Sequence, residues 1–374
     1  MKEYVIKTRN GIERFVYQQV LKRIYFTIDP ERVHDAMTNV GKILGRCAIT
    51  RALTKVLFFY SNAKLKQVVA GIAFKNPVGL AAGFDKDAFL TDIMGSVGFG
   101  FEEVGSITGE RCEGNQRPRL WRMQRSKGLV VYYGLKNEGC ERIAARLSKK
   151  RLTLPVGTSI AMTNDETTST REAGIADYAK AFKKFVEIGD YFTINISCPN
   201  TCQGEPFTEP DALEELLAVL DMIPTKKPIF LKLSADLSND RVDELVAVAD
   251  RHRITGFICT NLTKKRGTER IKDDNVPDKG GMSGKVVQDL SDAMIAHIYK
   301  KTQGRFIIIG CGGIFSAKDA YHKITLGASL VQMVTGMIFE GPQVISEINQ
   351  GLVGLLEADG FVTITDAIGS KNRL

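Results

Sequence analysis

Short apolar runs alternate with amphipathic segments along most of the chain after residue 62. The runs lie at residues 78–82, 101–107, 156–160, 191–196, 229–233, 256–260, 306–310 and 329–334. Segments near 87–97, 138–149, 174–188, 211–223, 239–252, 285–302, 316–326 and 341–357 place apolar residues at roughly 3.6-residue intervals, which is typical of helices. Eight strand-helix units predict an α/β fold, a closed (β/α)₈ TIM barrel over residues 63–374, rather than an open doubly wound sheet.

The first 62 residues have a different pattern, in which apolar clusters alternate with cations at spacings that suit amphipathic helices. Asp29 and Pro30 mark a break between two of these helices. Asp29 is placed to cap the second helix and Pro30 to occupy its first turn. Residues 1–62 are therefore predicted to form an N-terminal helical extension of the barrel.

The positive charge is concentrated in this extension. Residues 1–62 hold eleven Lys and Arg against five Asp and Glu, whereas the whole chain carries a net charge of +8. A basic amphipathic helix pair is typical of a surface that binds anionic lipid. The alternatives are a solvated helical cap docked on the barrel and a nucleic-acid surface. No nucleic-acid motif is recognisable, so no nucleic acid is expected as a partner.

Composition excludes several other classes of protein. The 374 residues are 44% hydrophobic and 25% charged, which excludes a disordered chain or a fibrous repeat. The seven cysteines include no CxxC pair, so neither a zinc site nor a secreted disulfide framework is expected. No apolar stretch approaches the roughly 18 residues of a membrane span, and no signal peptide is recognisable.

Chemistry in such a barrel belongs to the residues at the C-terminal ends of the strands. The predicted strands are followed there by glycines, amides and lysines. Gly313 and Gly336, after the seventh and eighth strands, lie where these barrels present backbone N–H groups to a phosphate. Tight turns are the alternative explanation. A glycine loop at 280–284 would let the backbone approach the same ligand.

Lys232 lies within an apolar predicted strand, where a cation is costly unless it meets negative charge. A reduced flavin carries such charge, and a lysine that reaches the rim of the barrel is the alternative. Cys198 precedes a proline and is flanked by Asn195 and Asn200. A thiol without a histidine partner indicates removal of a mildly acidic carbon-bound proton, whereas a buried structural cysteine is the alternative.

Six ordered motifs resemble the dihydroorotate dehydrogenases, FMN-dependent barrels that oxidise dihydroorotate to orotate in pyrimidine synthesis. The resemblance covers nearly the whole chain and rests on stretches 76–86, 98–105, 114–119, 195–201, 280–284 and 327–332. It implies that FMN is bound by Ala82, Gly83, Ser106, Asn164, Asn195, Lys232, Thr260, Gly284, Gly313, Thr335 and Gly336. It implies that the substrate meets Lys86, Asn195, Asn200 and Asn261, with Cys198 as the base that removes the C5 proton.

The stretch 29–34 with its flanking helices resembles the membrane-associated, quinone-using class of this family. This resemblance implies a quinone as electron acceptor, a tunnel to the flavin within residues 1–62, and a peripheral position on a membrane. The scattered cysteines fit a reducing cytosol, so the cytoplasmic side of the membrane is expected. Two residues depart from that class. Cys198 stands where the class has serine, and Val131 stands where the family has a substrate-binding asparagine, a loss that Lys136 or Asn137 would have to offset.

These departures leave two further functions open. One is a related FMN-dependent enzyme that acts on another dihydropyrimidine or on dihydrouridine in tRNA. The other is a flavin-binding protein attached to membranes that has no catalytic activity.

Overall fold

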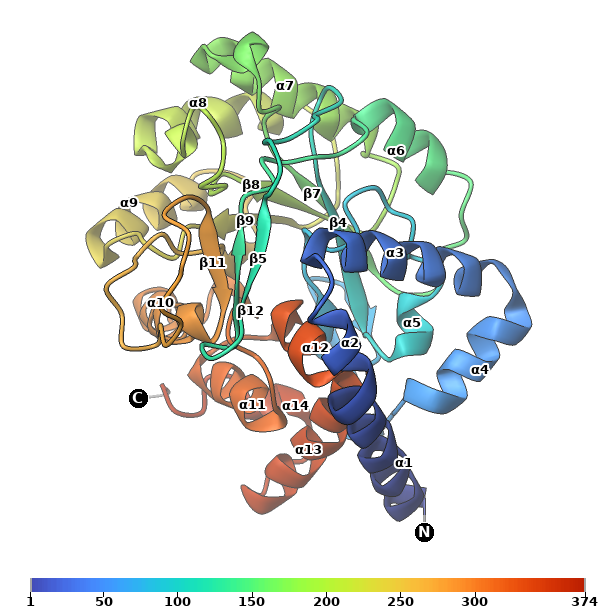
Figure 1. Cartoon of the computed structure of the whole chain (residues 1–374). Coiled ribbons are helices and arrows are strands. Elements are labelled where there is room, and N and C mark those ends of the chain that lie inside the picture. Colours follow the sequence, from blue (N-terminus) through green and yellow to red (C-terminus); the bar gives the residue numbers. More distant parts are fainter. Residues whose placement is uncertain (1, 373–374) are drawn as a thin grey trace.

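The computed structural model describes residues 2–372, in which eight parallel strands close into a barrel (Figure 1). The strands pair in the order β10-β12-β13-β3-β4-β7-β8-β9. Their bounds are β3 (Val78–Leu80), β4 (Phe101–Ile107), β7 (Val156–Ile160), β8 (Tyr191–Asn195), β9 (Ile229–Leu233), β10 (Gly256–Cys259), β12 (Ile307–Cys311) and β13 (Leu330–Met333). The predicted barrel is confirmed, and every predicted strand is present.

A helix follows each barrel strand and covers the outside of the barrel. These helices are α5 (Met94–Val97), α6 (Cys140–Leu147), α7 (Arg171–Lys184), α8 (Pro210–Asp221), α9 (Asn239–Asp250), α10 (Gln288–Thr302), α11 (Ala317–Leu326) and α13 (Val344–Ala358). Helix α12 (Thr335–Glu340) begins directly after β13, and α14 (Ile364–Ala367) lies near the C-terminus. Short 3₁₀ turns occupy Ala63–Leu65, Glu166–Thr168, Pro206–Thr208 and Lys285–Val287.

Large side chains fill the end of the barrel at which the strands begin. Phe101, Tyr191 and Phe230 are buried inside it and meet edge to face. A hairpin of β1 (Gln67–Val69) and β2 (Ile72–Phe74) packs Phe74 against Phe101, with ring centroids 5.3 Å apart. Burial of each such side chain contributes about 1.5–3 kcal/mol, so this end is a packed core and the opposite end is left for a site.

A separate three-stranded antiparallel sheet lies over the C-terminal ends of the barrel strands. It consists of β5 (Leu120–Met123), β6 (Gly128–Val131) and β11 (Gly281–Gly284). The prediction of a loop at 280–284 was therefore wrong, because this segment pairs with β6. Gly284 has a φ of +84°, and a Cβ there would lie 2.3 Å from the Lys127 carbonyl oxygen, so the close strand contact requires glycine.

The N-terminal extension is helical, as predicted. It contains α1 (Lys2–Val16), a π-helical segment Tyr17–Leu21, α2 (Lys22–Tyr25), α3 (Pro30–Arg46) and α4 (Ala48–Phe58). Asp29 caps α3 by accepting a hydrogen bond from the Arg32 backbone N–H at 3.0 Å, and Pro30 is its first residue. Figure 1 shows α1 beside α13, and α3 contacts β5.

A buried ion pair attaches α3 to the barrel. Glu31 Oε1 accepts hydrogen bonds from Arg119 Nη2 at 2.8 Å and from Arg117 Nη2 at 2.9 Å. Burial alone would raise the pKa of Glu31, but the hydrogen bonds from the two guanidinium groups lower that pKa below its usual value. Arg119 is buried with Glu31, whereas the Arg117 side chain is 60% exposed. The Arg119 contact is therefore the one that water cannot replace.

We expect Glu31→Gln to lower the free energy of unfolding by about 3–5 kcal/mol, because it leaves the Arg119 charge buried without a counterion. Arg117→Ala removes the exposed partner of the same carboxylate and is the matched control, with an expected cost of about 0–1 kcal/mol. Urea denaturation of both variants measures the difference. Equal losses would contradict the assignment of Arg119 as the principal partner.

Candidate active site

A cavity of about 200 Å³ opens at the C-terminal ends of the barrel strands. Strands β3, β4, β8, β9, β10, β12 and β13, or the loops after them, contribute to its wall, and β6 and β11 contribute from the covering sheet. The predicted site residues that line it are Ala82, Gly83, Lys86, Ser106, Asn195, Cys198, Asn200, Lys232, Thr260, Asn261, Gly284, Gly313, Thr335 and Gly336. Residues separated by more than 250 positions are thus brought to one place.

Asn164 is the one predicted site residue that does not line this cavity. Its Oδ1 accepts a hydrogen bond from the Cys202 backbone N–H at 2.8 Å, and its Nδ2 donates to the Gly134 carbonyl at 3.3 Å. In this structure Asn164 therefore supports the loop that follows β8 and carries Cys198.

Three amide and hydroxyl side chains form a network at the ends of β4, β8 and β10. Asn195 Nδ2 donates to Ser106 Oγ at 2.8 Å, and Asn195 Oδ1 accepts from Asn261 Nδ2 at 3.2 Å. Asn261 Nδ2 also donates to the Ser197 carbonyl at 2.6 Å. These contacts fix the orientations of the two amides. Buried amides held in this way present defined donors and acceptors to a planar polar ligand.

Asn200 differs from the other two amides because one of its polar atoms has no partner. Its Nδ2 donates to the Val131 carbonyl at 2.9 Å. Its Oδ1 is buried and accepts no hydrogen bond from any residue in the range 2–372. An unpaired buried acceptor costs about 1–3 kcal/mol, so a ligand N–H that reaches this oxygen would be favoured.

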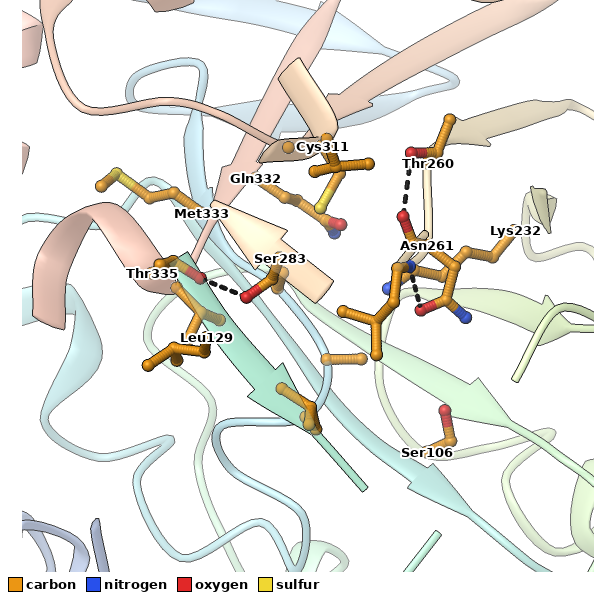
Figure 2. A pocket seen from close by; sticks show the side chains of 18 of the residues that line it. Ser106, Leu129, Lys232, Thr260, Asn261, Ser283, Cys311, Gln332, Met333 and Thr335 are labelled. Atoms are coloured by element: carbon orange, nitrogen blue, oxygen red, sulfur yellow. Dashed lines mark hydrogen bonds between the residues drawn. The ribbon is translucent and has the colours of Figure 1, made fainter. Parts of the chain in front are cut away.

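Lys232 extends from β9 into the cavity and is only 5% exposed. No hydrogen bond or ion pair engages its ammonium group within the described part of the chain. Figure 2 shows Lys232 on the same side of the cavity as Thr260 and Asn261. A buried and unpaired cation favours a ligand that carries or acquires negative charge.

The opposite side of the cavity is built from glycines and two hydroxyl groups. Thr335 Oγ1 and Ser283 Oγ lie 2.8 Å apart (Figure 2). A Cβ at Gly336 would lie 2.0 Å from the Ile314 carbonyl oxygen, and one at Gly313 would lie 2.3 Å from Gln288 Cβ. Gly83 has open space where its Cβ would project. Close packing against neighbouring protein atoms therefore requires glycine at 313 and 336, whereas the absence of a side chain at Gly83 leaves open space.

Cys198 lines the cavity on the loop after β8 and is half-buried. Burial raises the pKa of its thiol to about 11, and the nearby Glu205 acts in the same direction. A hydrogen bond with the Asn200 backbone and the charge of Lys232 oppose that rise. The thiol is therefore protonated at neutral pH, and its rarer thiolate is a strong proton acceptor.

Lys86 lies where the cavity meets the N-terminal extension. Its Nζ is 3.1 Å from His34 Nε2 and 4.1 Å from the centroid of the Tyr133 ring. Burial lowers the pKa of Lys86 to about 8, and nearby Asp87 and Asp35 limit that decrease. Burial, and then the charge of Lys86, lower the pKa of His34 well below its usual value, so His34 is the neutral partner.

A second, larger chamber of about 480 Å³ lies between the N-terminal helices and the barrel. Its lining is predominantly apolar and comes mainly from α3, α4 and the loops that follow β3 and β13. It shares Gly83, Lys86, Leu129, Val131, Tyr133 and Val334 with the barrel cavity. The two spaces therefore meet along a common wall.

Several cavity residues were not predicted from the sequence. Leu129 and Tyr133 come from or follow β6, and Gln332 and Cys311 come from β13 and β12. Val131 also lines the cavity, in agreement with the resemblance that placed its position at the substrate. Gln332 lies in the motif at 327–332. Side chains along a barrel strand alternate between the interior and the exterior, and this alternation would have indicated Gln332. Leu129 and Tyr133 had no such signal, because the pairing that carries β6 over the cavity is not local.

Residues 2–372 contain neither a metal-binding cluster nor a membrane-spanning helix. No three His, Cys, Asp or Glu side chains in the range 2–372 gather into a group that could hold a metal ion. Over the same range, no helix has both the length and the apolar character needed to cross a lipid bilayer.

Comparison with known proteins gives one consistent result. A family model described as dihydroorotate dehydrogenase matches residues 64–356. A relative from Trichodesmium erythraeum, named dihydroorotate dehydrogenase (quinone), is 33% identical over 96% of this chain and 99% of its own length. A relative of the same name from Nostoc punctiforme is 36% identical over 95% of this chain and 98% of its own.

A solved structure supports the same relationship. The crystal structure of DHODH from Eimeria tenella in complex with ferulenol superimposes with a TM-score of 0.83 at 28% sequence identity. The match covers 92% of this chain and 96% of that chain, which is more than the barrel alone and therefore includes part of the N-terminal extension.

Proposed function

The chain belongs to the dihydroorotate dehydrogenase family, and from that membership we propose that it oxidises dihydroorotate to orotate in pyrimidine biosynthesis and passes the electrons to a quinone. The observation that carries this proposal is the common wall between a polar cavity at the barrel mouth and an apolar chamber under the N-terminal helices. A polar substrate and an apolar electron acceptor would thus reach one redox group from two sides.

FMN is the flavin that the cavity suits. Lys232 offers an unpaired buried ammonium group, and Gln332 offers a buried Oε1 without a partner among residues 2–372. Glycines 284, 313 and 336 line the cavity and carry no side chain because a Cβ at each would collide with neighbouring protein atoms, and a wall of bare backbone suits a phosphate. When bound, FMN supplies the acceptor for the hydride that leaves C6 of the substrate.

The remaining predicted FMN contacts are proposed on the same basis. Ala82, Gly83, Ser106, Asn195 and Thr260 line the cavity between Lys232 and the glycines. Asn164 lies outside the cavity lining, and its proposed contribution is to support the loop that carries Cys198.

Cys198 is the proposed catalytic base. Its thiolate would accept the proton from C5 of dihydroorotate while the C6 hydride leaves. The raised pKa of the thiol makes the thiolate basic enough for a weakly acidic C–H bond but lowers its population at neutral pH. No histidine is required in this scheme, because the proton is taken directly by sulfur.

The substrate would be oriented by charge and by amide hydrogen bonds. Lys86 would bind the carboxylate. Asn200 Oδ1, which is buried and otherwise has no partner among residues 2–372, would accept a hydrogen bond from a ring N–H. Asn195 and Asn261 would complete the contacts to the ring. Their mutual hydrogen bond holds both amides in place before the substrate arrives.

A quinone is favoured over a soluble electron acceptor, although a cysteine base is typical of the soluble, non-quinone class. The apolar chamber of about 480 Å³ suits a quinone ring and its tail and offers few partners for NAD or fumarate. The relatives named as quinone enzymes span nearly the whole chain, including the helices that form this chamber. The identity of the base therefore does not determine the acceptor.

The N-terminal helices are proposed to rest on a membrane from its cytoplasmic side. Most of the large apolar side chains that are exposed in the described part of the chain lie before residue 58. Ile43, Ile49 and Val56 are 62%, 70% and 70% exposed. The cations of the same segment would contact anionic headgroups, and a membrane-dissolved quinone would then enter the apolar chamber directly.

Anaerobic titration of the purified protein with dihydroorotate tests the function directly. We expect the flavin absorbance to bleach because the substrate reduces the flavin, and a short-chain quinone to restore it faster than fumarate or NAD. An absorbance that dihydroorotate leaves unchanged would contradict the activity. Faster recovery with fumarate or NAD would contradict only the acceptor.

Cys198→Ala should slow flavin reduction by dihydroorotate on the order of 10²- to 10⁴-fold, because the proton at C5 loses its acceptor. In the unsubstituted protein, the apparent second-order rate constant should rise about tenfold per pH unit up to about pH 8, since only the thiolate accepts the proton. It should level off above that pH, where Lys86 loses the charge that binds the substrate carboxylate. Anaerobic stopped-flow absorbance measures both effects.

Cys202→Ala is the matched control for the substitution of the base. Cys202 is an exposed thiol four residues further along the same loop, and it does not line the cavity. Its removal should leave reduction unchanged. Equal losses in the two variants would indicate damage to the loop rather than the loss of a base.

The double variant Ile49→Glu with Val56→Glu should bind vesicles of phosphatidylcholine and phosphatidylglycerol at least about tenfold more weakly, because two side chains no longer enter the bilayer. Co-sedimentation measures the binding. Met222→Glu on the exposed end of α8 is the control, since Met222 is 83% exposed but lies outside the N-terminal helices. Equal binding by both variants would contradict this orientation.

A further inference from the structure

The replacement of the usual asparagine by Val131 leaves the substrate end of the cavity without one polar contact. Two neighbouring residues, Lys136 and Asn137, are positioned in sequence to offset this loss. Asn137 is only 3% exposed and does not line the cavity. Its Nδ2 donates to Thr108 Oγ1 and to the Leu135 carbonyl, both at 2.8 Å, and its Oδ1 accepts from the Gly139 N–H at 2.8 Å. Asn137 is therefore committed to holding its own loop.

Lys136 has the opposite character. It lines the cavity together with Lys86 and Tyr133, and the same three residues line an adjoining polar chamber of about 320 Å³. Asp35 and Asp87 also line that chamber, but neither carboxylate lies within ion-pair distance of Lys136. Within the described part of the chain, no hydrogen bond or ion pair engages its ammonium group.

The two lysines disfavour each other in the absence of an anion. The positive charge of Lys136 contributes to the lowered pKa of Lys86, after burial, and to the lowered pKa of His34. Lys86 has a neutral neighbour, His34, in place of a carboxylate partner. A ligand carboxylate beside both lysines would remove this repulsion and give each ammonium group a charged acceptor.

We propose that Lys136 is a second carboxylate-binding cation, which acts with Lys86 to make this site select anionic dihydropyrimidines over uncharged ones. The inference rests on the proposed oxidation of dihydroorotate and names a specificity determinant for it. In the family, an asparagine amide at the position of Val131 contributes to substrate binding. In this chain the positive charge of Lys136 would contribute instead. Val131 then contributes only apolar contact, on the wall shared with the apolar chamber.

Lys136→Met tests this assignment, because methionine keeps most of the side-chain length and removes the charge. Stopped-flow reduction should show a half-saturating dihydroorotate concentration raised about tenfold or more, with a limiting rate changed less than about threefold. The dissociation constant for orotate, measured from the flavin spectrum, should rise by the same factor. The constant for orotate methyl ester should stay unchanged, because the ester carries no charge for Lys136 to bind.

Lys149→Met is the matched control, since it removes one exposed lysine that lines none of these cavities. It should leave all four quantities unchanged. Unaltered orotate binding in Lys136→Met would overturn the assignment of Lys136, and so would an equal loss of affinity for orotate and its ester. Neither outcome would contradict the proposed function. If dihydroorotate failed to reduce the unsubstituted protein, the proposed function and this inference would both fall.

Discussion

Closure of eight parallel strands is the constraint on which the site depends. Parallel strands in one closed ring place all their C-terminal ends around a single opening. Cys198, Lys232 and Thr335 come from three different strand ends and meet there because the ring closes. The packed aromatic layer at the other end keeps the ring rigid. Functional side chains can therefore be buried at the opening with defined orientations.

The sequence contained enough information for the barrel and for most of the cavity lining, because both follow from short-range patterns. Buried parallel strands are apolar runs, and the residues that follow them lie at the opening. The covering sheet could not be predicted in this way. Its strand β11 is the glycine-rich stretch 281–284, whose strand geometry comes from hydrogen bonds with β6, about 150 residues away. Leu129 and Val131 reach the cavity through that pairing, and only the family resemblance, which placed position 131 at the substrate, pointed to one of them.

Asn164 and Asn200 illustrate the corresponding limit for side chains. Both are amides on loops after barrel strands, and sequence alone assigns them to the site equally well. The fold distinguishes them, because the loop after β7 turns Asn164 toward the Cys202 backbone, whereas Asn200 keeps an unpaired oxygen at the cavity. Which amide is free for a ligand depends on contacts with neighbouring loops. Such contacts cannot be read from the spacing of residues along one segment.

Helix α3 separates two environments around Lys86. Val33, Met37, Val40 and Leu44 recur at helical intervals and face the apolar chamber, whereas Asp35, Thr38 and Asn39 face the polar one. A carboxylate would lose its hydration in the apolar chamber without compensation, and a quinone tail would gain nothing from the polar one. One amphipathic helix thus favours separate routes for the two reactants. Because Glu31 anchors this helix through Arg119, the same ion pair that attaches the extension also maintains the separation.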